Sequence, residues 1–291
     1  MQKTSAGNAE LLALIARLRG CDCTYVPNPG NAGDSLIALA TYQLFERHGL
    51  QVEVGHHSGH YPGRVVILGG GGNLIPEYKD IYQAILRNKD TAEELILLPH
   101  TVHGYDELLA SLDERCILFG REERSFTYLK QQALRATVHL ADDMAFTVDL
   151  SELSTLPMLN PGIVTTEWPA RRARRLRRML KIQSGRLRHG GTLNAIRLDR
   201  EKTDVEVPPH NFDLSDIFMD NVLDRRSVWQ TVSMLAATIR PYRKVRTNRL
   251  HVAVLAALMG REVEMLDNSY GKNSAVYETS MQHMTNVTFV S

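Results

Sequence analysis

Few cysteines, no long apolar run and almost no net charge mark this 291-residue sequence. Cys21, Cys23 and Cys116 form no Cys-x-x-Cys pair, which argues against a disulfide framework and against a four-ligand zinc site. The longest apolar run, Val252 to Met259, is far shorter than the ~20 residues that a transmembrane helix needs. The formal charge of +1 gives no overall attraction to nucleic acid. We therefore expect a cytoplasmic protein with no nucleic-acid partner.

The remaining composition is that of a compact globular protein, with 43% hydrophobic and 23% charged residues. At ~150 residues per domain, the length allows one large domain or two mid-sized domains. Met1 to Arg19 lacks the basic segment and apolar core of an export signal, and its spacing of leucines predicts an amphipathic helix instead.

Short apolar runs alternate with helical patterns in the first half of the chain, which is typical of an α/β fold with a mostly parallel sheet. The expected strands are Cys23–Val26, Gln51–Val54, Val65–Leu68, Leu95–Leu98 and Cys116–Phe119. The expected helices are Ser35–His48, Lys79–Arg87, Asp106–Leu112 and Glu122–Gln131.

A stretch rich in Ser, Thr, Pro and Asn, Leu150–Gly162, interrupts this alternation and predicts a domain boundary. Beyond it, the expected strands are Ile163–Thr165, Leu193–Ile196, Lys244–Thr247 and Glu262–Leu266, and the expected helices are Ser227–Ile239 and Arg249–Met259. The sequence thus predicts two α/β lobes, residues 1–150 and 151–291, with a cleft between them.

A strongly basic segment lies in the second half. Pro169 to Arg197 contains nine arginines, one lysine and no acidic residue. Four of its apolar residues fall at helical spacing: Ala173, Leu176, Met179 and Leu180. This pattern indicates a basic amphipathic helix that contacts an anionic membrane surface through Pro169–Arg188, with a solvated surface helix or loop as the alternative.

Two turns follow predicted strands, at the sheet edge where α/β proteins bind ligands. The strand Val65–Leu68 runs into four glycines and Asn73. Gly70 and Gly71 would let a ligand approach the main chain closely, although a tight turn without a ligand explains them as well. The other turn ends at Asp34, which is either a helix cap or an acceptor for sugar hydroxyls.

Arg121 follows the predicted strand Cys116–Phe119. Its planar, permanently charged guanidinium suits a carboxylate or a phosphate at the carboxyl end of that strand. A surface ion pair with Glu122 or Glu123 is the alternative.

The stretch Thr247 to His251 joins a predicted strand to an apolar helix. Arg249 and His251 then lie at the helix start, where free N–H groups and the positive helix end favour an anion. Because imidazole exchanges protons near neutral pH, His251 is the candidate for acid–base chemistry. A buried structural histidine with Arg249 covering the helix is the alternative.

Histidines cluster at His56, His57 and His60, and again at His100 and His103. Adjacent histidines point apart, and neither group has a carboxylate at a convincing spacing, so we predict no metal site. The Gly-x-Ser-x-Gly motif and the signature of a cysteine nucleophile are absent from the sequence.

Taken in this order, these stretches resemble the polysaccharide pyruvyl transferase family. The resemblance rests on Asn31-Ala32-Gly33-Asp34, the glycine turn, Arg121 with Ser125, Asp143 in Ala141–Phe146, Thr247–His251 and Lys272. Arg249-Leu250-His251 is its most specific element. Such proteins are similar to two-lobed glycosyltransferases of the GT-B type, so the resemblance implies two Rossmann-like lobes facing a cleft.

The resemblance also implies an activity: pyruvate is transferred from phosphoenolpyruvate to two hydroxyls of a glycan sugar, forming a cyclic ketal without a cofactor. It implies a catalytic His251 and donor contacts from Arg249, Arg121, Asn248 and Lys272. The candidates for the cleft and the acceptor are Asn31, Asp34, Gly70, Gly71, Asn73, Asp143 and His100. The acceptor would be lipid-linked if the basic segment contacts a membrane. A GT-B glycosyltransferase that uses a nucleotide sugar and a non-catalytic glycan-binding protein are the alternatives.

Overall fold

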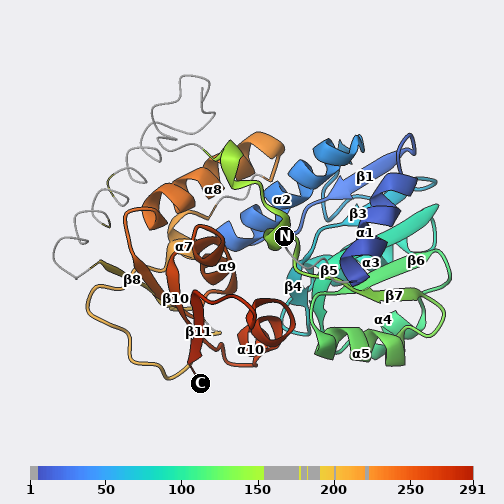
Figure 1. Cartoon of the computed structure of the whole chain (residues 1–291). Coiled ribbons are helices and arrows are strands. Elements are labelled where there is room, and N and C mark those ends of the chain that lie inside the picture. The colour runs from blue at the N-terminus through green and yellow to red at the C-terminus, as the bar shows by residue number, and fades with distance from the viewer. Residues whose placement is uncertain are drawn as a thin grey trace. The chain divides into compact units, whose positions relative to one another are not determined.

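The computed structural model describes residues 6–153, 191–199, 201–219 and 223–290, together with Arg177 and Ile182. The described residues form two compact units, whose elements are labelled in Figure 1. Unit 1 comprises the described parts of Met1–Pro29 and Ile37–Val148. Unit 2 comprises Gly30–Leu36 and the described parts of Asp149–Ser291, so a short early segment belongs with the second half of the chain.

Unit 1 is built on a parallel sheet. Its strands are β1 (Cys23–Val26), β2 (Glu53–Val54), β3 (Val65–Leu68), β4 (Gly71–Leu74), β5 (Glu94–Val102), β6 (Cys116–Gly120) and β7 (Thr137–Leu140). The strand order is β2-β1-β3-β5-β6-β7, and β4 pairs with β5 outside this path. Every pairing between these strands is parallel. Parallel neighbours need crossover connections, which the intervening helices supply.

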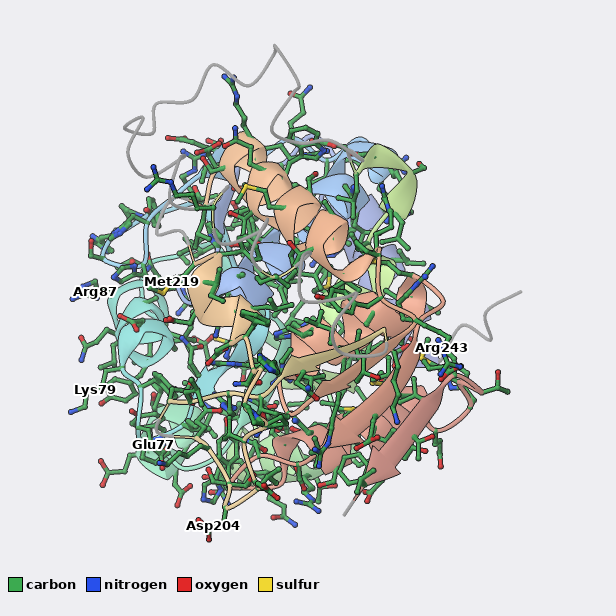
Figure 2. All side chains as sticks on the ribbon, turned by 90° about the vertical axis from the view of Figure 1, so that its left-hand side faces the viewer. Glu77, Lys79, Arg87, Asp204, Met219 and Arg243 are labelled. Atoms are coloured by element: carbon green, nitrogen blue, oxygen red, sulfur yellow. The ribbon has the colours of Figure 1, made fainter. Side chains whose placement is uncertain are left out.

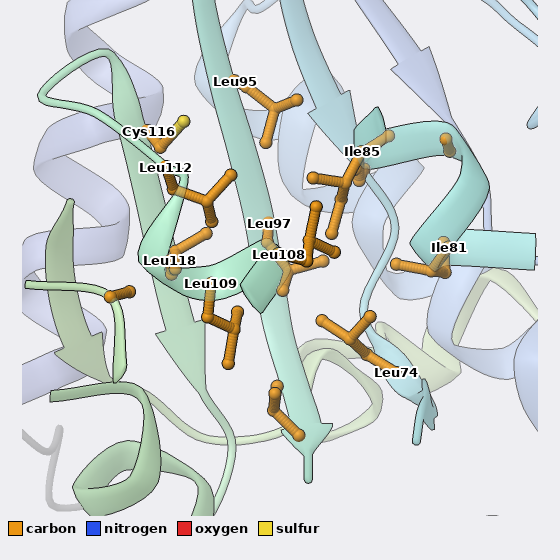
Figure 3. Packing of buried hydrophobic residues seen from close by; sticks show 14 of the residues in the cluster. Leu74, Ile81, Ile85, Leu95, Leu97, Leu108, Leu109, Leu112, Cys116 and Leu118 are labelled. Carbon is orange, nitrogen blue, oxygen red and sulfur yellow. The ribbon is translucent and has the colours of Figure 1, made fainter. Parts of the chain in front are cut away.

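The helices of unit 1 cover both faces of this sheet. They are α1 (Ala6–Arg17), α2 (Ala32–His48, of which Ala32–Leu36 belongs to unit 2), α3 (Asp80–Asn88), α4 (Asp106–Ala110) and α5 (Glu123–Gln132), followed by the 3₁₀ turn η1 (Met144–Thr147). Figure 3 shows one core, in which Leu97 of β5 packs among Ile85 of α3 and Leu109 of α4. On the opposite face, Tyr25 of β1 meets Tyr42 and Phe45 of α2 edge to face, with centroid distances of 5.2 and 5.4 Å.

Unit 2 contains a second parallel sheet. Its strands are β8 (Thr192–Ala195), β9 (Lys244–Thr247), β10 (Glu262–Leu266) and β11 (Val287–Val290), in the order β11-β10-β9-β8. All three pairings are parallel. The helices are α7 (Leu214–Ile217), α8 (Arg225–Ile239), α9 (Leu250–Leu258) and α10 (Lys272–Val276), with the short turns η2 (Leu150–Glu152) and η3 (Tyr277–Met281). Asp224 caps α8 by accepting hydrogen bonds from the N–H groups of Arg226 and Ser227 at 2.9 and 3.0 Å.

The expected α/β class is confirmed, and the parallel sheets are compatible with a Rossmann-like fold. The predicted bounds of β1, β3, β9 and β10 match the structure residue for residue. The expected helix Ser35–His48 begins three residues earlier, at Ala32, because Asn31 rather than Asp34 caps it. The glycine turn was incompletely predicted, since Gly71–Leu74 continues as strand β4. Strands β7 and β11 were missed.

Several expectations fall on residues that the structure does not describe. The predicted strand Ile163–Thr165 lies outside the described residues, as does Pro169–Arg188 except for Arg177 and Ile182. Contact of this segment with an anionic membrane stays a prediction. Among the helices that are described, none is both long enough and apolar enough to cross a membrane.

Charged side chains project from the outer surface of each unit. Figure 2 shows Glu77, Lys79 and Arg87 of unit 1 pointing outward, and all three are exposed. Asp204 and Arg243 of unit 2 are likewise exposed. In α/β proteins, polar residues with a function lie at the carboxyl ends of the strands instead.

The core of unit 1 makes a stability prediction. Leu97 is 0% exposed, so Leu97→Ala leaves a cavity and should lower the free energy of unfolding by about 2–5 kcal/mol. Leu134 is 81% exposed, and Leu134→Ala should change the free energy by less than about 0.5 kcal/mol. Urea denaturation followed by circular dichroism measures both. Equal losses in the two variants would contradict the packing described here.

Candidate functional site

Three polar residues of unit 1 join the carboxyl ends of neighbouring strands. Asn28 follows β1, Asn73 lies in β4, and His100 lies in β5. The amide nitrogen Nδ2 of Asn73 donates to Oδ1 of Asn28 at 2.7 Å. The Nε2 atom of His100 lies 3.2 Å from the backbone nitrogen of Asn73 and 3.0 Å from its Oδ1. All three side chains are buried or nearly so, and their hydrogen bonds hold the strand ends together.

The glycines before Asn73 make room for the protein's own chain. Gly71 has a φ of +154°, and a Cβ there would lie 2.3 Å from Nδ2 of Asn28. A Cβ on Gly70 would lie 2.8 Å from the carbonyl oxygen of Pro99. Asn28 and Pro99 therefore occupy the space that a side chain at these positions would need. These contacts fit the tight-turn alternative, and the approach of a ligand to Gly70 or Gly71 stays a prediction.

His100 is held in its neutral form. Burial, and after it the positive charge of Arg121, lower the pKa of His100 from 6.5 to about 3. A hydrogen bond with the Gly69 backbone and the charge of Asp143 act in the opposite direction. With 0% of its surface exposed and this low pKa, His100 serves as a buried hydrogen-bonding group in the structure.

Arg121, at the end of β6, makes a buried ion pair with Asp143. Its Nη1 donates to Oδ2 of Asp143 at 2.7 Å, and its Nε donates to Oγ1 of Thr101 at 2.8 Å. Both side chains of the ion pair are 0% exposed. The alternative of a surface pair with Glu122 is wrong, because Glu122 instead caps α5 by accepting from the backbone N–H of Ser125 at 2.8 Å. Nη2 of Arg121 has no hydrogen-bond partner among the described residues.

In unit 2, the turn between β9 and α9 is held from both sides. Oγ1 of Thr247 donates to the carbonyl of Ala195 at 2.6 Å and accepts from the backbone N–H of Arg249 at 3.0 Å. Oδ1 of Asn248 accepts from the backbone N–H of Arg197 at 2.8 Å. On the other side, Nδ2 of Asn273 donates to the carbonyl of Asn248 at 2.8 Å. The conformation of this turn is therefore fixed by the end of β8 with the residues that follow it, and by α10.

Arg249 is bound by two carboxylates. Its Nε and Nη2 donate to the two carboxylate oxygens of Asp213, at 2.9 and 2.6 Å, which is the bidentate geometry that suits a guanidinium. Its Nη1 lies 2.9 Å from Oδ2 of Asp199. Asp213 reaches this position because Asn211 pairs with Asn194 at the edge of β8, and its own Oδ2 accepts from the backbone N–H of Leu198 at 3.0 Å.

These contacts extend into a larger ion-pair network. Asp199 also binds Arg197, at 2.8 Å, and Arg197 lies 2.6 Å from Glu201. Glu201 in turn lies 3.2 Å from Nζ of Lys272. The network thus contains three cations, Arg197, Arg249 and Lys272, and three carboxylates, Asp199, Glu201 and Asp213, so its formal charge is zero.

The ion pair between Arg197 and Asp199 favours the charged form of both residues. Burial acts to raise the pKa of Asp199, but the hydrogen bond from Arg197 and the charges of Arg249 and Arg197 outweigh it, and the pKa is lowered. Burial acts to lower the pKa of Arg197, and its contacts with Asp199 and Glu201 raise it overall. These charged partners offset the loss of hydration of the buried Arg197 guanidinium.

His251 lies in the first turn of α9, against the first turn of α2. A Cβ on Gly33 would lie 2.5 Å from Nδ1 of His251, which places the imidazole directly beside the Gly33 backbone. Asn31 caps α2, since its Oδ1 accepts from the backbone N–H of Gly33 at 2.8 Å. Oδ2 of Asp34 accepts from the backbone N–H of Asn31 at 2.7 Å. Asp34 and Asn31 therefore form a reciprocal capping box beside His251.

Within each unit, the structure brings several sequence-predicted residues together. Asn73 lies next to His100 and Arg121 next to Asp143 in unit 1, while Asn31, Asp34 and His251 gather in unit 2. Three carboxylates of the ion-pair network were not predicted from the sequence: Asp199, Glu201 and Asp213. The alternation Arg197-x-Asp199-x-Glu201 after a predicted strand was the available signal for two of them. No group of three or more potential metal ligands occurs within the described ranges.

Comparison with known proteins identifies the family of this chain. The family model for polysaccharide pyruvyl transferase matches residues 31–270, which include Asn31, Asp34, Arg121 and His251. The chain belongs to the polysaccharide pyruvyl transferase family. The family assignment confirms the resemblance found in the sequence and implies a pyruvyl transferase with a polysaccharide acceptor.

Two relatives of this pyruvyl transferase family member span most of its length. One is the Bacillus subtilis (strain 168) protein named "Putative pyruvyl transferase EpsO", which is 24% identical over 88% of this chain and 84% of its own. The other is a crystal structure of a functionally uncharacterized protein from Klebsiella pneumoniae, with 28% identity and a TM-score of 0.78. That match covers 99% of both chains.

The buried His100 makes a prediction about pH. Below pH 6.5 the unfolded chain binds a proton at His100, whereas the folded protein does not bind it until about pH 3. The unfolded state therefore gains protons first, and stability should fall as the pH drops through this window, by up to about 1.4 kcal/mol per pH unit.

His100→Gln removes this titrating group. The wild type should therefore lose unfolding free energy relative to the variant, steadily from pH 6.5 to 4. Urea denaturation at each pH measures the difference. The matched control is His103→Gln, which changes an exposed histidine of the same unit and should show no such trend. A difference that is independent of pH would show that His100 has the same pKa in the folded and the unfolded protein, and would contradict the buried neutral imidazole.

Proposed function

We propose that this member of the family transfers pyruvate from phosphoenolpyruvate to two hydroxyls of a polysaccharide sugar, forming a cyclic ketal and releasing phosphate. The observation that carries the proposal is the start of α9, where His251 lies beside the capped start of α2 and two residues after Arg249. The family assignment supports the pyruvyl transferase activity. The identity of the donor and the ketal product are the proposed parts.

The start of α9 supports binding of an anionic donor. Arg249 has an extended backbone, with φ −93° and ψ 108°, and its side chain makes no capping hydrogen bond. The first N–H groups of a helix have no partner within the helix, and the helix dipole adds positive potential there. We propose that these N–H groups and the outer edge of the Arg249 guanidinium bind the phosphate or carboxylate of phosphoenolpyruvate. Nδ2 of Asn248 is buried without a partner among the described residues and is a further donor group in the same turn.

We assign the proton transfers to His251. The imidazolium gives a proton to the methylene carbon of phosphoenolpyruvate, and the adjacent carbon becomes electrophilic. The first sugar hydroxyl attacks that carbon, forms a C–O bond and returns its proton to His251. The second hydroxyl then attacks the same carbon while the bond to phosphate breaks, and its proton leaves with the phosphate. The methylene has become a methyl group, and one phosphate is released for each ketal formed.

The other candidates keep their predicted roles within this proposal. Asn31 and Asp34 are proposed to contact the acceptor because they lie beside His251. Lys272 of unit 2 is a proposed donor contact, although it already pairs with Glu201, so it would use only its remaining N–H groups. The donor contact expected of Arg121, which lies in unit 1 and pairs with Asp143, stays a prediction from the sequence.

The activity is tested by incubating the purified protein with phosphoenolpyruvate and a panel of free and lipid-linked glycans. We expect phosphate release that depends on one class of glycan, with a matching mass gain on that glycan. Transfer from a nucleotide sugar without phosphate release from phosphoenolpyruvate would show a glycosyltransferase instead. Binding of a glycan with no turnover of either donor would show a non-catalytic glycan-binding protein.

The role of His251 is tested by His251→Gln. Loss of a general acid and base should lower kcat by about 10²-fold or more, while the KM for phosphoenolpyruvate stays near wild type. The matched control is His283→Gln, which changes an exposed histidine of the same unit and should leave kcat unchanged. A variant with lower thermal stability but wild-type turnover of the folded protein would show that His251 is structural.

The role of Arg249 is tested against Arg197, a second buried arginine that binds the same Asp199. Arg249→Lys keeps the charge but loses the fork, and it should raise the KM for phosphoenolpyruvate by about tenfold or more. Arg197→Lys should disturb the ion-pair network to a similar degree and leave this KM within about twofold of wild type. Similar KM values in the two variants would show that Arg249 acts only through the network.

A further inference from the structure

A side chain at position 33 would require His251 to move, and it would also come within 3.0 Å of Oδ1 of Asn31. A Cβ built on Gly33 would lie 2.5 Å from Nδ1 of His251 and 3.0 Å from its Cβ. Real Cβ atoms essentially never approach another heavy atom to less than 3.0 Å. Because both the ring and the Cβ of His251 are involved, a rotation of the ring alone leaves the contact at the Cβ tight.

The backbone on the Gly33 side has little freedom to withdraw. The Gly33 N–H is bound by Oδ1 of Asn31, and the Asn31 N–H is bound by Oδ2 of Asp34. These two hydrogen bonds fix the first turn of α2 in both directions. A methyl group at position 33 therefore remains directed at His251.

The backbone on the His251 side is equally restrained. Asn248 and Arg249 precede it in the turn that is bonded to Ala195, Arg197 and Asn273. The Arg249 side chain is held by Asp213 at two points. The imidazole is the movable part of this contact, so it is the part that a methyl group would displace.

We propose that Gly33 is a positioning residue for His251. The missing side chain lets the Nδ1 edge of the imidazole rest against the first turn of α2, which leaves Nε2, on the far side of the ring, as the atom that transfers the proton. This inference rests on the proposed function, because it assumes that His251 performs the proton transfers. On this proposal, the glycine in Asn31-Ala32-Gly33-Asp34 is needed for the space beside His251 and not for an unusual backbone conformation.

A purely helical role for Gly33 predicts the opposite result from a positioning role. Alanine is a better helix former than glycine, and φ at Gly33 lies outside the left-handed range. If the residue mattered for the helix alone, Gly33→Ala would leave turnover unchanged and stabilise the protein. If Gly33 positions His251, the same change lowers kcat by about tenfold or more, with a small change in the KM for phosphoenolpyruvate.

The decisive experiment is a double-mutant cycle of Gly33→Ala and His251→Ala in the full chain, with kcat and thermal stability measured for all four proteins. His251→Ala removes the ring and keeps only the Cβ contact. We expect Gly33→Ala to lower kcat strongly in the wild type and to have almost no further effect in the His251→Ala background. Independent, multiplicative effects of the two substitutions would overturn the inference.

The thermal stabilities of the four proteins test the inference even if Gly33→Ala folds poorly. A collision between the methyl group and the ring should be relieved when the ring is removed, so the double variant should melt at a higher temperature than Gly33→Ala alone. No recovery would place the damage in the helix start and overturn the inference. If His251→Ala by itself leaves kcat unchanged, the catalytic assignment of His251 fails, while the stability coupling still reports whether Gly33 and the ring are in contact.

Discussion

The bidentate ion pair between Arg249 and Asp213 fixes the site in unit 2, because it ties the turn after β9 to the segment beside β8. His251 follows Arg249 by two residues, so its position depends on this pair. Breaking a buried pair by removing one partner leaves an uncompensated charge, which typically costs about 3–5 kcal/mol. The surrounding hydrogen bonds of Thr247 and Asn248 distribute the same constraint over the end of β8, the residues after it and α10.

At the carboxyl edge of the unit 1 sheet, polar side chains also hold the strand ends in place, but the residues are different. Parallel strands that are buried on both faces end in loops, whose polar groups must find partners inside the protein. Arg121 and Asp143 supply a charged pair, and Asn73 and His100 supply a neutral one. Burial, and after it the charge of the Arg121 guanidinium, lower the pKa of His100 and keep its imidazole uncharged. The charged pair therefore contributes to the neutral state of the other pair.

The sequence predicted most of the central strands, because short continuous apolar runs such as Val65–Leu68 are typical of strands that are buried on both faces of a parallel sheet. It could not show that Gly71–Leu74 is a strand, because glycines carry no periodicity and β4 is defined by its pairing with β5. It identified His251 and Arg249 but not the partners of Arg249. Asp213 lies in a stretch without regular spacing and is brought to Arg249 by hydrogen bonds of Asn211, which are long-range contacts.

A neutral network changes what a donor site beside Arg249 can recognise. Three cations and three carboxylates cancel, so a phosphate or carboxylate gains little from net charge there. Recognition then depends on the directions of hydrogen bonds, which the N–H groups at the start of α9 and the outer N–H groups of Arg249 would donate. The plane of the Arg249 guanidinium is already fixed by Asp213. Groups held in advance lose little entropy when a ligand binds. If the donor is the proposed phosphoenolpyruvate, selection depends on the spacing between its phosphate and its carboxylate, and a single inorganic anion would satisfy only part of the site.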